Sequence, residues 1–199
     1  MMHPDTALRY VSPERGFGVV ATAPIPKGTI LYVQDPLDIV IRPGDPINED
    51  PLYRRTFATY AYIEPDGTRI VCWDHGKYMN HCCHPNSLST GYGFEVAIQN
   101  IAKDDEITDH YGVLNLEHDM ELSCSRTDCC KRIGPGTLKR EHEWMDVAIR
   151  TALSDVHHVA QPLMGLLKPS IDRALTDYLR NGYGYRSVLS LQHVGPNGV

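Results

Sequence analysis

The sequence has few of the features that would place a protein outside the ordinary globular class. None of its apolar runs approaches the roughly 18 residues that span a membrane. Its first residues lack the basic and then apolar regions of a secretory signal, and it contains no internal repeat or low-complexity segment. The 199 residues, 42% of them hydrophobic, suffice for one domain with a buried core. We expect the protein in the cytoplasm, or in the nucleus of a eukaryote, and not secreted.

The six cysteines lack the spacing of a disulfide framework. They include two adjacent pairs, Cys82-Cys83 and Cys129-Cys130, which are awkward to cross-link. Without an export signal, cysteines in such a pattern are interpreted as free thiols or metal ligands.

Basic residues are scarce in the first two thirds of the chain. Residues 1–130 hold 10 basic and 19 acidic side chains, a charge of −9, whereas residues 131–199 hold 9 and 6, a charge of +3. A charge of −9 argues against direct binding to a nucleic-acid backbone and favours a cationic partner. An acidic face that only keeps the protein in solution is an equally good interpretation.

The spacing of apolar residues changes near residue 134. Up to residue 112, short stretches rich in Val, Ile and Tyr are separated by turn-forming residues, which is typical of many short strands. Asp66-Gly67 lies between two such stretches and predicts a hairpin. After Gly136, a helical stripe runs from Met145 to Val159, and a second helix is expected over 169–180, capped by Gly182. The pattern predicts a mainly β part followed by a packed helical layer.

Three segments contain the residues of chemical interest, and each is a weak signal alone. Gly16-Phe17-Gly18 suggests a turn, because the third glycine and the following helix of a dinucleotide site are missing. Residues 80–86 offer four potential metal ligands in a row, which cannot all reach one ion. Residues 104–112 read as a turn, a strand and a terminating glycine.

In their order and joint spacing, these segments resemble the SET domain, the fold of one large class of protein lysine methyltransferases. The family pattern runs Gly-x-Gly, Ile-x-x-Gly, Asn-His-Ser-Cys-x-Pro-Asn and Glu-(Leu/Ile)-Thr-Tyr-Asp-Tyr-Gly. Here these appear at residues 16–18, 25–28, 80–86 and 106–112, with Cys82 in place of the serine. The resemblance covers roughly residues 8–134. It implies a mainly β SET domain of the β-clip type over residues 1–134, in which the last two segments cross as a pseudoknot, with a helical extension over 135–199.

The resemblance also implies a cofactor, S-adenosylmethionine, and a set of residues that hold it. Gly16, Phe17 and Gly18 would line its methionine and ribose end. Its carboxylate, ribose and adenine would be held by Lys77, Tyr78, Asn80 and His81. The substrate lysine would enter from the opposite face through a narrow channel with Tyr60 and Tyr62 in its wall and Tyr111 at its inner end.

Methyl transfer from a sulfonium is an in-line displacement, so most of the catalytic work is alignment and exclusion of water. A lysine with a pKa near 10.4 must first lose its proton. A tight apolar channel beside a sulfonium lowers that pKa by desolvation and by like charge, so no carboxylate base is required on this argument. Tyr111, the expected catalytic residue, would orient the methyl group. A tyrosine that only closes the pseudoknot is the alternative.

Two positions near Tyr111 depart from the family pattern, and two tyrosines lie beyond it. Asp109 stands where the family has Tyr or Phe in the channel, and it could pair with the entering ammonium or hold a water. His110 replaces the usual Asp. Tyr183 and Tyr185 could supply further channel aromatics, or they could belong to ordinary packing.

A fourth segment, residues 122–132, resembles the zinc-binding tail of the family. Cys83, Cys124 and Cys129 match three of its four cysteines, and Leu122 occupies the place of the remaining one. Cys130 or His84 could substitute as the fourth ligand that structural zinc requires. A tail of reduced cysteines that pack as small apolar groups is the alternative.

Taken together, the sequence predicts a protein-lysine N-methyltransferase that uses S-adenosylmethionine and acts on an exposed lysine in a basic segment of another protein. The alternative is a SET-fold module that binds a basic peptide without turnover. A third interpretation, a cysteine-rich metal protein without a cofactor, would show metal and no nucleoside binding. The C-terminal helices could also form the seam of an oligomer.

Overall fold

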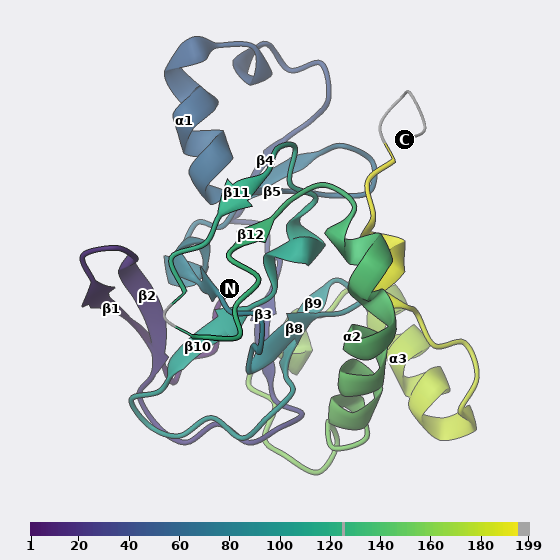
Figure 1. Cartoon of the computed structure of the whole chain (residues 1–199). Coiled ribbons are helices and arrows are strands. Elements are labelled where there is room, and N and C mark those ends of the chain that lie inside the picture. The colour runs from purple at the N-terminus through teal and green to yellow at the C-terminus, as the bar shows by residue number, and fades with distance from the viewer. Residues whose placement is uncertain (125, 195–199) are drawn as a thin grey trace.

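Small β-sheets organise the first 133 residues in the computed structural model, which describes residues 1–124 and 126–194 (Figure 1). One sheet has the order β1-β2-β10-β7, formed by Thr6–Ser12, Gly16–Ala21, Glu106–Asp109 and Asn80–His81. A second has the order β3-β9-β8, formed by Ile30–Val33, Phe94–Ala97 and Ser87–Ser89. The short pair β11 and β12 joins Met120–Glu121 to Arg132–Ile133. The prediction of a mainly β fold is confirmed.

The expected hairpin around Asp66-Gly67 forms within a third sheet. Strands β5 (Ala61–Ile63) and β6 (Arg69–Val71) pair antiparallel, and β4 (Ile39–Ile41) adds to the other edge of β6. The preceding helix α1 (Pro51–Tyr60) was not expected from the strand-like pattern. Its signal is local, because Asp50 accepts a hydrogen bond from the Leu52 amide at 2.9 Å and a proline follows it. The helix buries none of its residues, so it has little apolar periodicity to reveal it.

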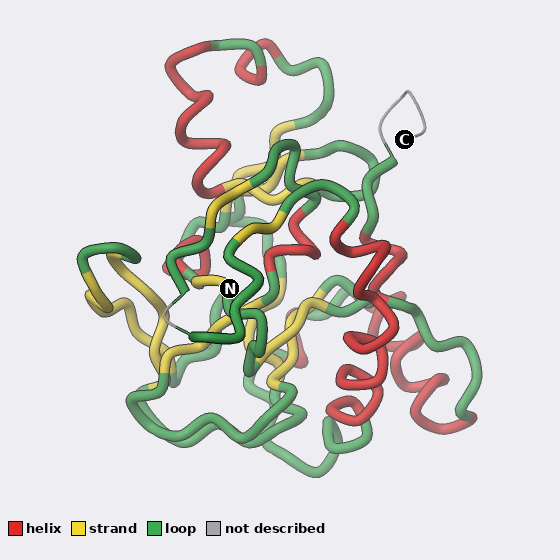
Figure 2. The backbone as a smooth tube through the Cα atoms, viewed as in Figure 1, coloured by secondary structure: helices red, strands yellow, loops and turns green. Residues whose placement is uncertain are grey.

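Two helices form the C-terminal part, as the helical spacing predicts (Figure 2). Helix α2 (Thr137–Leu153) begins after Gly136 and ends earlier than the expected stripe, although Val156 remains fully buried. Helix α3 (Pro169–Asn181) ends at Gly182, whose φ of +72° is the left-handed conformation of a C-terminal cap. Short 3-10 turns connect the elements at Pro46–Asn48, His75–Tyr78, Tyr111–Leu114, Met164–Leu166 and Val188–Leu191.

The largest hydrophobic core joins the helical part to the second sheet. Ile149 and Leu153 of α2 are fully buried in one cluster with Ile30, Leu88 and Val96 of β3, β8 and β9. The C-terminal extension is therefore a layer packed on the β part, as predicted, while the division at residue 134 remains a prediction. Among the described residues, no helix has the length and apolar character needed to span a membrane.

Candidate active site

The segments 80–86 and 106–112 meet side by side at the centre of the candidate site. Strands β7 and β10 pair in parallel, with Thr108 opposite Asn80 and Asp109 opposite His81. The Asn86 side chain fastens the crossing, since its Nδ2 donates to the Glu106 carbonyl at 2.8 Å and its Oδ1 accepts from the Thr108 amide at 2.9 Å. This places the Asn80 and Tyr111 ends of the two segments together.

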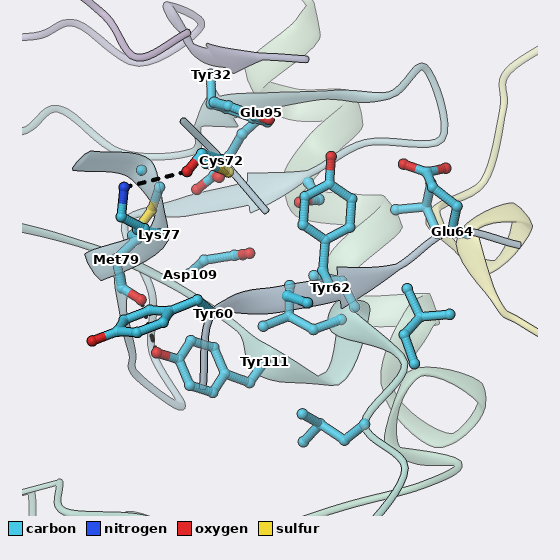
Figure 3. Close-up of a pocket in the computed structure, with 18 of the residues that line it drawn as sticks. Tyr32, Tyr60, Tyr62, Glu64, Cys72, Lys77, Met79, Glu95, Asp109 and Tyr111 are labelled. Atoms are coloured by element: carbon cyan, nitrogen blue, oxygen red, sulfur yellow. Dashed lines mark hydrogen bonds between the residues drawn. The ribbon is translucent and has the colours of Figure 1, made fainter. Parts of the chain in front are cut away.

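A cavity of about 130 Å³ opens on one side of this crossing (Figure 3). Tyr60 and Tyr62 enter its wall from the end of α1 and from β5, while Asp109 and Tyr111 come from β10 and the turn after it. The structure therefore brings together four of the six residues that the sequence predicts for one channel. Further aromatic, apolar and acidic side chains complete the lining, among them Tyr32, Met79, Phe94, Glu95, Val113 and Leu191.

Tyr111 is held at both ends by hydrogen bonds to the residues around Asn80. Its hydroxyl donates to the Met79 carbonyl at 2.8 Å, and its amide donates to His81 Nδ1 at 3.1 Å. Burial, and to a lesser extent the charge of Asp109, raise the pKa of the Tyr111 hydroxyl to about 12. The phenol therefore stays protonated at neutral pH and remains a hydrogen-bond donor of fixed orientation.

A second cavity, of about 160 Å³, is also lined by Tyr111. It is more polar, with Glu14 and Arg15 from the β1–β2 turn, Asn80 and His81 from β7, and residues 120–124 closing it. Tyr111 and Met120 line both cavities. Two clefts of different chemistry, one aromatic and one charged, therefore meet at a single tyrosine.

Gly18 permits the close packing behind the polar cavity. A Cβ at this position would lie 2.6 Å from Glu106 Oε1, 2.7 Å from Val11 Cγ2 and 2.9 Å from Asn80 Nδ2. Asn80 Nδ2 donates to the Glu106 carboxylate at 2.8 Å and to the Phe17 carbonyl at 3.1 Å. The same Glu106 oxygen accepts from Arg15 at 2.8 Å. Glycine is required here because the side chains that orient Asn80 occupy the space of a Cβ.

A comparison with models of protein families assigns the segments of this site to one family. The model of the SET domain family matches residues 16–112. These residues form a SET domain.

A sequence comparison with curated proteins finds no match. Among solved structures, a protein of Plasmodium falciparum assigned as a histone methyltransferase is 24% identical with a TM-score of 0.41, over 56% of this chain and 96% of the other. The methyltransferase domain of human histone-lysine N-methyltransferase SETMAR is 18% identical with a TM-score of 0.49, over 68% of this chain and 59% of the other.

The polar cavity of the SET domain fits the charge pattern of S-adenosylmethionine, which the family generally uses. Arg15 offers a cation for a carboxylate, and Glu14 and Glu121 offer anions for ammonium or sulfonium groups. The Asn80 amide is already oriented by its two hydrogen bonds. Sequence reasoning missed Arg15, although it directly precedes the Gly16-Phe17-Gly18 motif.

The other residues expected at the cofactor lie next to the polar cavity or turn away from it. The half-exposed Phe17 ring packs edge-on against Tyr78 at 6.3 Å, and Tyr78 packs against Tyr60 at 5.5 Å. Gly16 adopts a φ of +69° at the start of β2. Lys77 lines the aromatic cavity, where its ammonium donates to three backbone carbonyls, those of Cys72, Trp73 and Asp74. The Lys77 side chain thus faces the aromatic cavity and not the polar one, and a contact of Lys77 with the cofactor, which could run through its main chain, stays a prediction.

Tyr183 and Tyr185 are not brought to the channel of the SET domain. Tyr183 is 83% exposed. Tyr185 packs between Tyr92 and Tyr178, and its hydroxyl donates to Asp146 of α2 at 2.7 Å. Leu191 is the residue of the C-terminal flank that reaches the cavity. Tyr185 belongs to the packing of the helical layer, the alternative that the sequence also allowed, whereas Tyr183 projects into solvent.

Three of the four cysteines expected at a zinc site converge. The Cys83 sulfur lies 3.7 Å from that of Cys129 and 3.4 Å from that of Cys130, near the roughly 3.8 Å that separates thiolates around tetrahedral zinc. Cys124 contacts the thiol of Cys82 instead. Among the described residues, the ligand atoms that all lie within 4.8 Å of one another are those of His81, Cys83 and Cys130, without Cys129, so a bound zinc stays a prediction.

His81 also lies beside these thiols, with its Nε2 3.4 Å from Cys83 Sγ. Burial, and then the neighbouring His110 and Arg15, lower the pKa of His81 to about 3, so the ring is neutral. Because Nδ1 accepts the Tyr111 amide proton, the single ring proton must sit on Nε2. A protonated Nε2 cannot ligate a metal. The hydrogen bond from the Tyr111 amide to Nδ1 therefore argues against His81 as a zinc ligand.

Proposed function

We propose that the protein transfers a methyl group from S-adenosylmethionine to a lysine side chain in a basic segment of another protein. The observation that supports this most strongly is the meeting of two clefts at Tyr111, one charged and one lined by tyrosines. A reaction that joins a charged cofactor to a long side chain from opposite sides needs this arrangement. S-adenosylmethionine would supply the methyl group and the positive charge that makes its carbon electrophilic.

Each residue of the site has a role that follows from its contacts. Asn80, held by Glu106 and the Phe17 carbonyl, presents its remaining amide oxygen to the polar cavity. Tyr60 and Tyr62 confine the aliphatic part of a lysine and exclude water around it. Tyr111, fixed through Met79 and His81, sets the position at which nitrogen and methyl carbon approach in line.

The charge of the chain supports a basic partner, which remains a proposal. Residues 1–130 carry a charge of −9, and the aromatic cavity itself contains the carboxyl groups of Glu64, Glu95 and Asp109. A cationic segment is attracted to such a surface. Cytoplasmic location, dimer formation through the C-terminal helices and a bound zinc likewise remain predictions.

The deciding experiment is a calorimetric titration of the purified protein with S-adenosylmethionine, with zinc determined on the same sample. We expect saturable binding near one per chain, at least tenfold weaker in Asn80→Ala. Asn181→Ala is the control, because Asn181 is exposed at the end of α3. Absence of binding by the folded wild-type protein would contradict the proposal.

Methyl transfer is then measured with radiolabelled cofactor and poly-L-lysine, using poly-L-arginine as the charge control. Label in poly-L-lysine alone supports the proposed reaction. Binding of poly-L-lysine without transfer would instead support the module that recognises a basic peptide without turnover.

A further inference from the structure

Two buried acids at the inner part of the aromatic cavity have no role in the mechanism described so far. Glu95 of β9 is 5% exposed and Asp109 of β10 is 4% exposed, and both line the cavity that ends at Tyr111. In Figure 3, Asp109 lies beside Tyr60 and Tyr111, while Glu95 lies toward Tyr32 and Cys72. In the described part of the chain, neither carboxyl forms an ion pair with a Lys, Arg or His side chain. An uncompensated buried acid pair is costly unless it has a partner or holds a proton.

One oxygen of Glu95 is aimed into the cavity. Its Oε1 contacts the Ser87 hydroxyl, whereas its Oε2 has no hydrogen-bond partner among the described residues. Yet Oε2 is not one of the fully enclosed polar atoms that lack a partner, so it must be reached from the cavity that Glu95 lines. The structure therefore leaves a hydrogen-bonding position open to whatever enters the channel.

Ser87 lets Glu95 exist with or without a proton. The Ser87 hydroxyl lies 2.9 Å from the Thr108 carbonyl and also contacts Glu95 Oε1, but it has a single proton to donate. When that proton points to the carbonyl, which can only accept, the contact with Glu95 requires a proton on the carboxyl. When Glu95 is ionised, the hydroxyl turns to donate to it. The same contact is thus satisfied in both states.

The titration behaviour of the pair agrees with this geometry. Burial raises the pKa of Glu95 to about 7, a value suited to a group that exchanges protons at neutral pH. Burial, and next the charge of Glu95, raise the pKa of Asp109 well above its ordinary value, and hydrogen bonds from His110 and Ser89 offset this only in part. At neutral pH the pair therefore holds a proton more firmly than two exposed carboxyl groups would, and Glu95 is the member whose pKa lies near that pH.

The groups that surround the pair do not supply a compensating charge. Burial raises the pKa values of three hydroxyl groups and one thiol, so these groups stay neutral; they belong to Tyr32, Tyr62, Tyr111 and Cys72. The pKa values of His81 and His110 are lowered, first by burial, so both rings are neutral as well. The Lys77 ammonium is bound to backbone carbonyls, and Glu64 adds a further acid in the same lining.

We propose that Glu95 and Asp109 together accept the proton that the substrate ammonium must lose before methyl transfer. This inference rests on the proposed function and names the proton acceptor of the same site. An N–H bond of the ammonium breaks, the proton forms an O–H bond on the pair, and the electron pair stays on nitrogen. That nitrogen then forms its bond to the methyl carbon while the carbon–sulfur bond breaks, its electrons remaining on sulfur.

The proton moves in this direction because two neutral groups are more stable than two charges in a dry channel. Desolvation disfavours both the ammonium and the carboxylate, and transfer of one proton neutralises both. The sequence-based argument relied on desolvation and a neighbouring sulfonium alone. The structure adds an acceptor at the place where the family has an aromatic side chain.

The first test needs neither cofactor nor substrate. Infrared titration of the wild-type protein should show a protonated carboxyl that persists at pH 7, well above the range of exposed acids. The band should weaken in Glu95→Gln and in Asp109→Asn, which preserve the shape of each side chain. If no carboxyl of the wild-type protein keeps its proton at pH 7, the inference is wrong whether or not the protein transfers methyl groups.

The second test is the pH profile of kcat/KM with poly-L-lysine. For the wild-type protein we expect activity to rise through a pKa near that of the pair and then to level off. In Glu95→Gln, the rate at pH 7 should fall by about 100-fold, and the deficit should shrink as the pH approaches the pKa of lysine near 10.4. Asp109→Asn should show the same change of profile.

The control is Glu64→Gln, an acid of the same cavity outside the pair. Glu64→Gln can change the rate itself, but kcat/KM should still rise with pH through the same pKa as in the wild-type protein. Calorimetry with S-adenosylmethionine verifies that each variant is folded. If transfer occurs but both pair variants keep the wild-type profile, the inference is overturned while the proposed function stands. If the wild-type protein transfers no methyl group, the proposed function fails, and the infrared result alone then decides whether the pair holds a proton.

Discussion

At the scale of single residues, Tyr111 and Gly18 show how much of the site depends on one atom. The Tyr111 hydroxyl is the polar atom placed where the aromatic and charged cavities meet, and it is fixed by the Met79 carbonyl. The missing Cβ of Gly18 leaves the space in which Glu106 and Asn80 hold each other. Tyr111 thus contributes its hydroxyl group, and Gly18 contributes the space that a side chain would fill.

Tyr111→Phe removes the hydroxyl and keeps the ring. We expect the single-turnover rate of methyl transfer to fall by roughly 100-fold, because the hydroxyl oxygen that Met79 fixes, and that would orient the methyl group, is lost. The affinity for S-adenosylmethionine should change by less than about 3-fold. Tyr178→Phe makes the same chemical change in the helical layer, where Tyr178 packs against Tyr92 and Tyr185, and should leave the rate unchanged. An unaltered rate in Tyr111→Phe would refute its assigned role.

Gly18→Ala places a methyl group within 3 Å of Glu106, Val11 and Asn80. Overpacking of this kind typically costs about 1–3 kcal/mol, so the free energy of unfolding should fall by that amount in urea denaturation. Because Asn80 must move, binding of S-adenosylmethionine should weaken at least 10-fold. Gly165→Ala is the control, since nothing lies within 4 Å of its added Cβ, and it should change stability by less than about 0.5 kcal/mol. Equal stability of the two variants would show that the Gly18 site relaxes.

At the scale of elements, Asp146 connects helix α2 to the C-terminal segment that reaches the aromatic cavity. Its carboxylate accepts from the Tyr185 hydroxyl at 2.7 Å, the Ser187 hydroxyl at 2.6 Å and the Val188 amide at 2.8 Å. Val188 begins the 3-10 turn that ends at Leu191, which lines the cavity. One buried carboxylate thus positions a wall of the site from a helix outside it.

Asp146→Ala leaves the Val188 amide buried without an acceptor and releases two hydroxyl groups. An unsatisfied buried polar group costs roughly 1–3 kcal/mol, so we expect the free energy of unfolding to fall by about 2–4 kcal/mol. Hydrogen exchange of residues 185–191 should accelerate before that of the sheets. Asp177→Ala, at an exposed position of α3, is the matched control, with an expected change below about 0.5 kcal/mol. Unchanged exchange in Asp146→Ala would mean that apolar contacts alone hold the segment.

At the scale of the whole molecule, buried acids and buried histidines give the stability opposite dependences on pH. The pKa values of His81 and His110 are lowered to about 3 and about 4, mainly by burial. The unfolded chain therefore binds more protons at these positions below pH 6.5, and the histidines lower stability as the pH falls. Glu95 acts in the other direction, because burial raises its folded pKa from 4.5 to about 7. The folded protein binds more protons there between these pH values, so stability is lost as the pH rises.

The difference in stability between Glu95→Gln and the wild-type protein isolates the titration of Glu95 and of Asp109, which responds to its charge, since the histidines are common to both. We expect the two proteins to differ little in pH dependence below pH 4.5. Between pH 4.5 and about 7, the variant should gain stability relative to the wild type, by on the order of 2–3 kcal/mol in total, and the difference should then level off. Urea denaturation across pH 4–8 measures it. A difference that stays constant with pH would show that folding does not change the pKa of Glu95.

The sequence by itself determined the features whose signals are local. Spacing in the chain was sufficient for the β5–β6 hairpin, the α3 cap at Gly182 and the order of the motifs that identify the SET domain. Helix α1 was missed because a helix that buries no side chain has no apolar stripe, and only its cap at Asp50 indicated it. Glu95 was missed too, although an acid between the buried Phe94 and Val96 is an unusual strand residue.

Only the tertiary structure decided which distant residues meet. Arg15 and Asn80 are 65 positions apart. Glu95 and Asp109 come to line one cavity because Ser87 of β8 contacts both Glu95 and the Thr108 carbonyl of the strand that contains Asp109. The tertiary structure likewise decided that Tyr185 bonds to Asp146, and that Cys124 contacts Cys82 and not Cys83. Such contacts depend on packing between elements, whose free energy is shared among many side chains and leaves no periodic trace in the sequence.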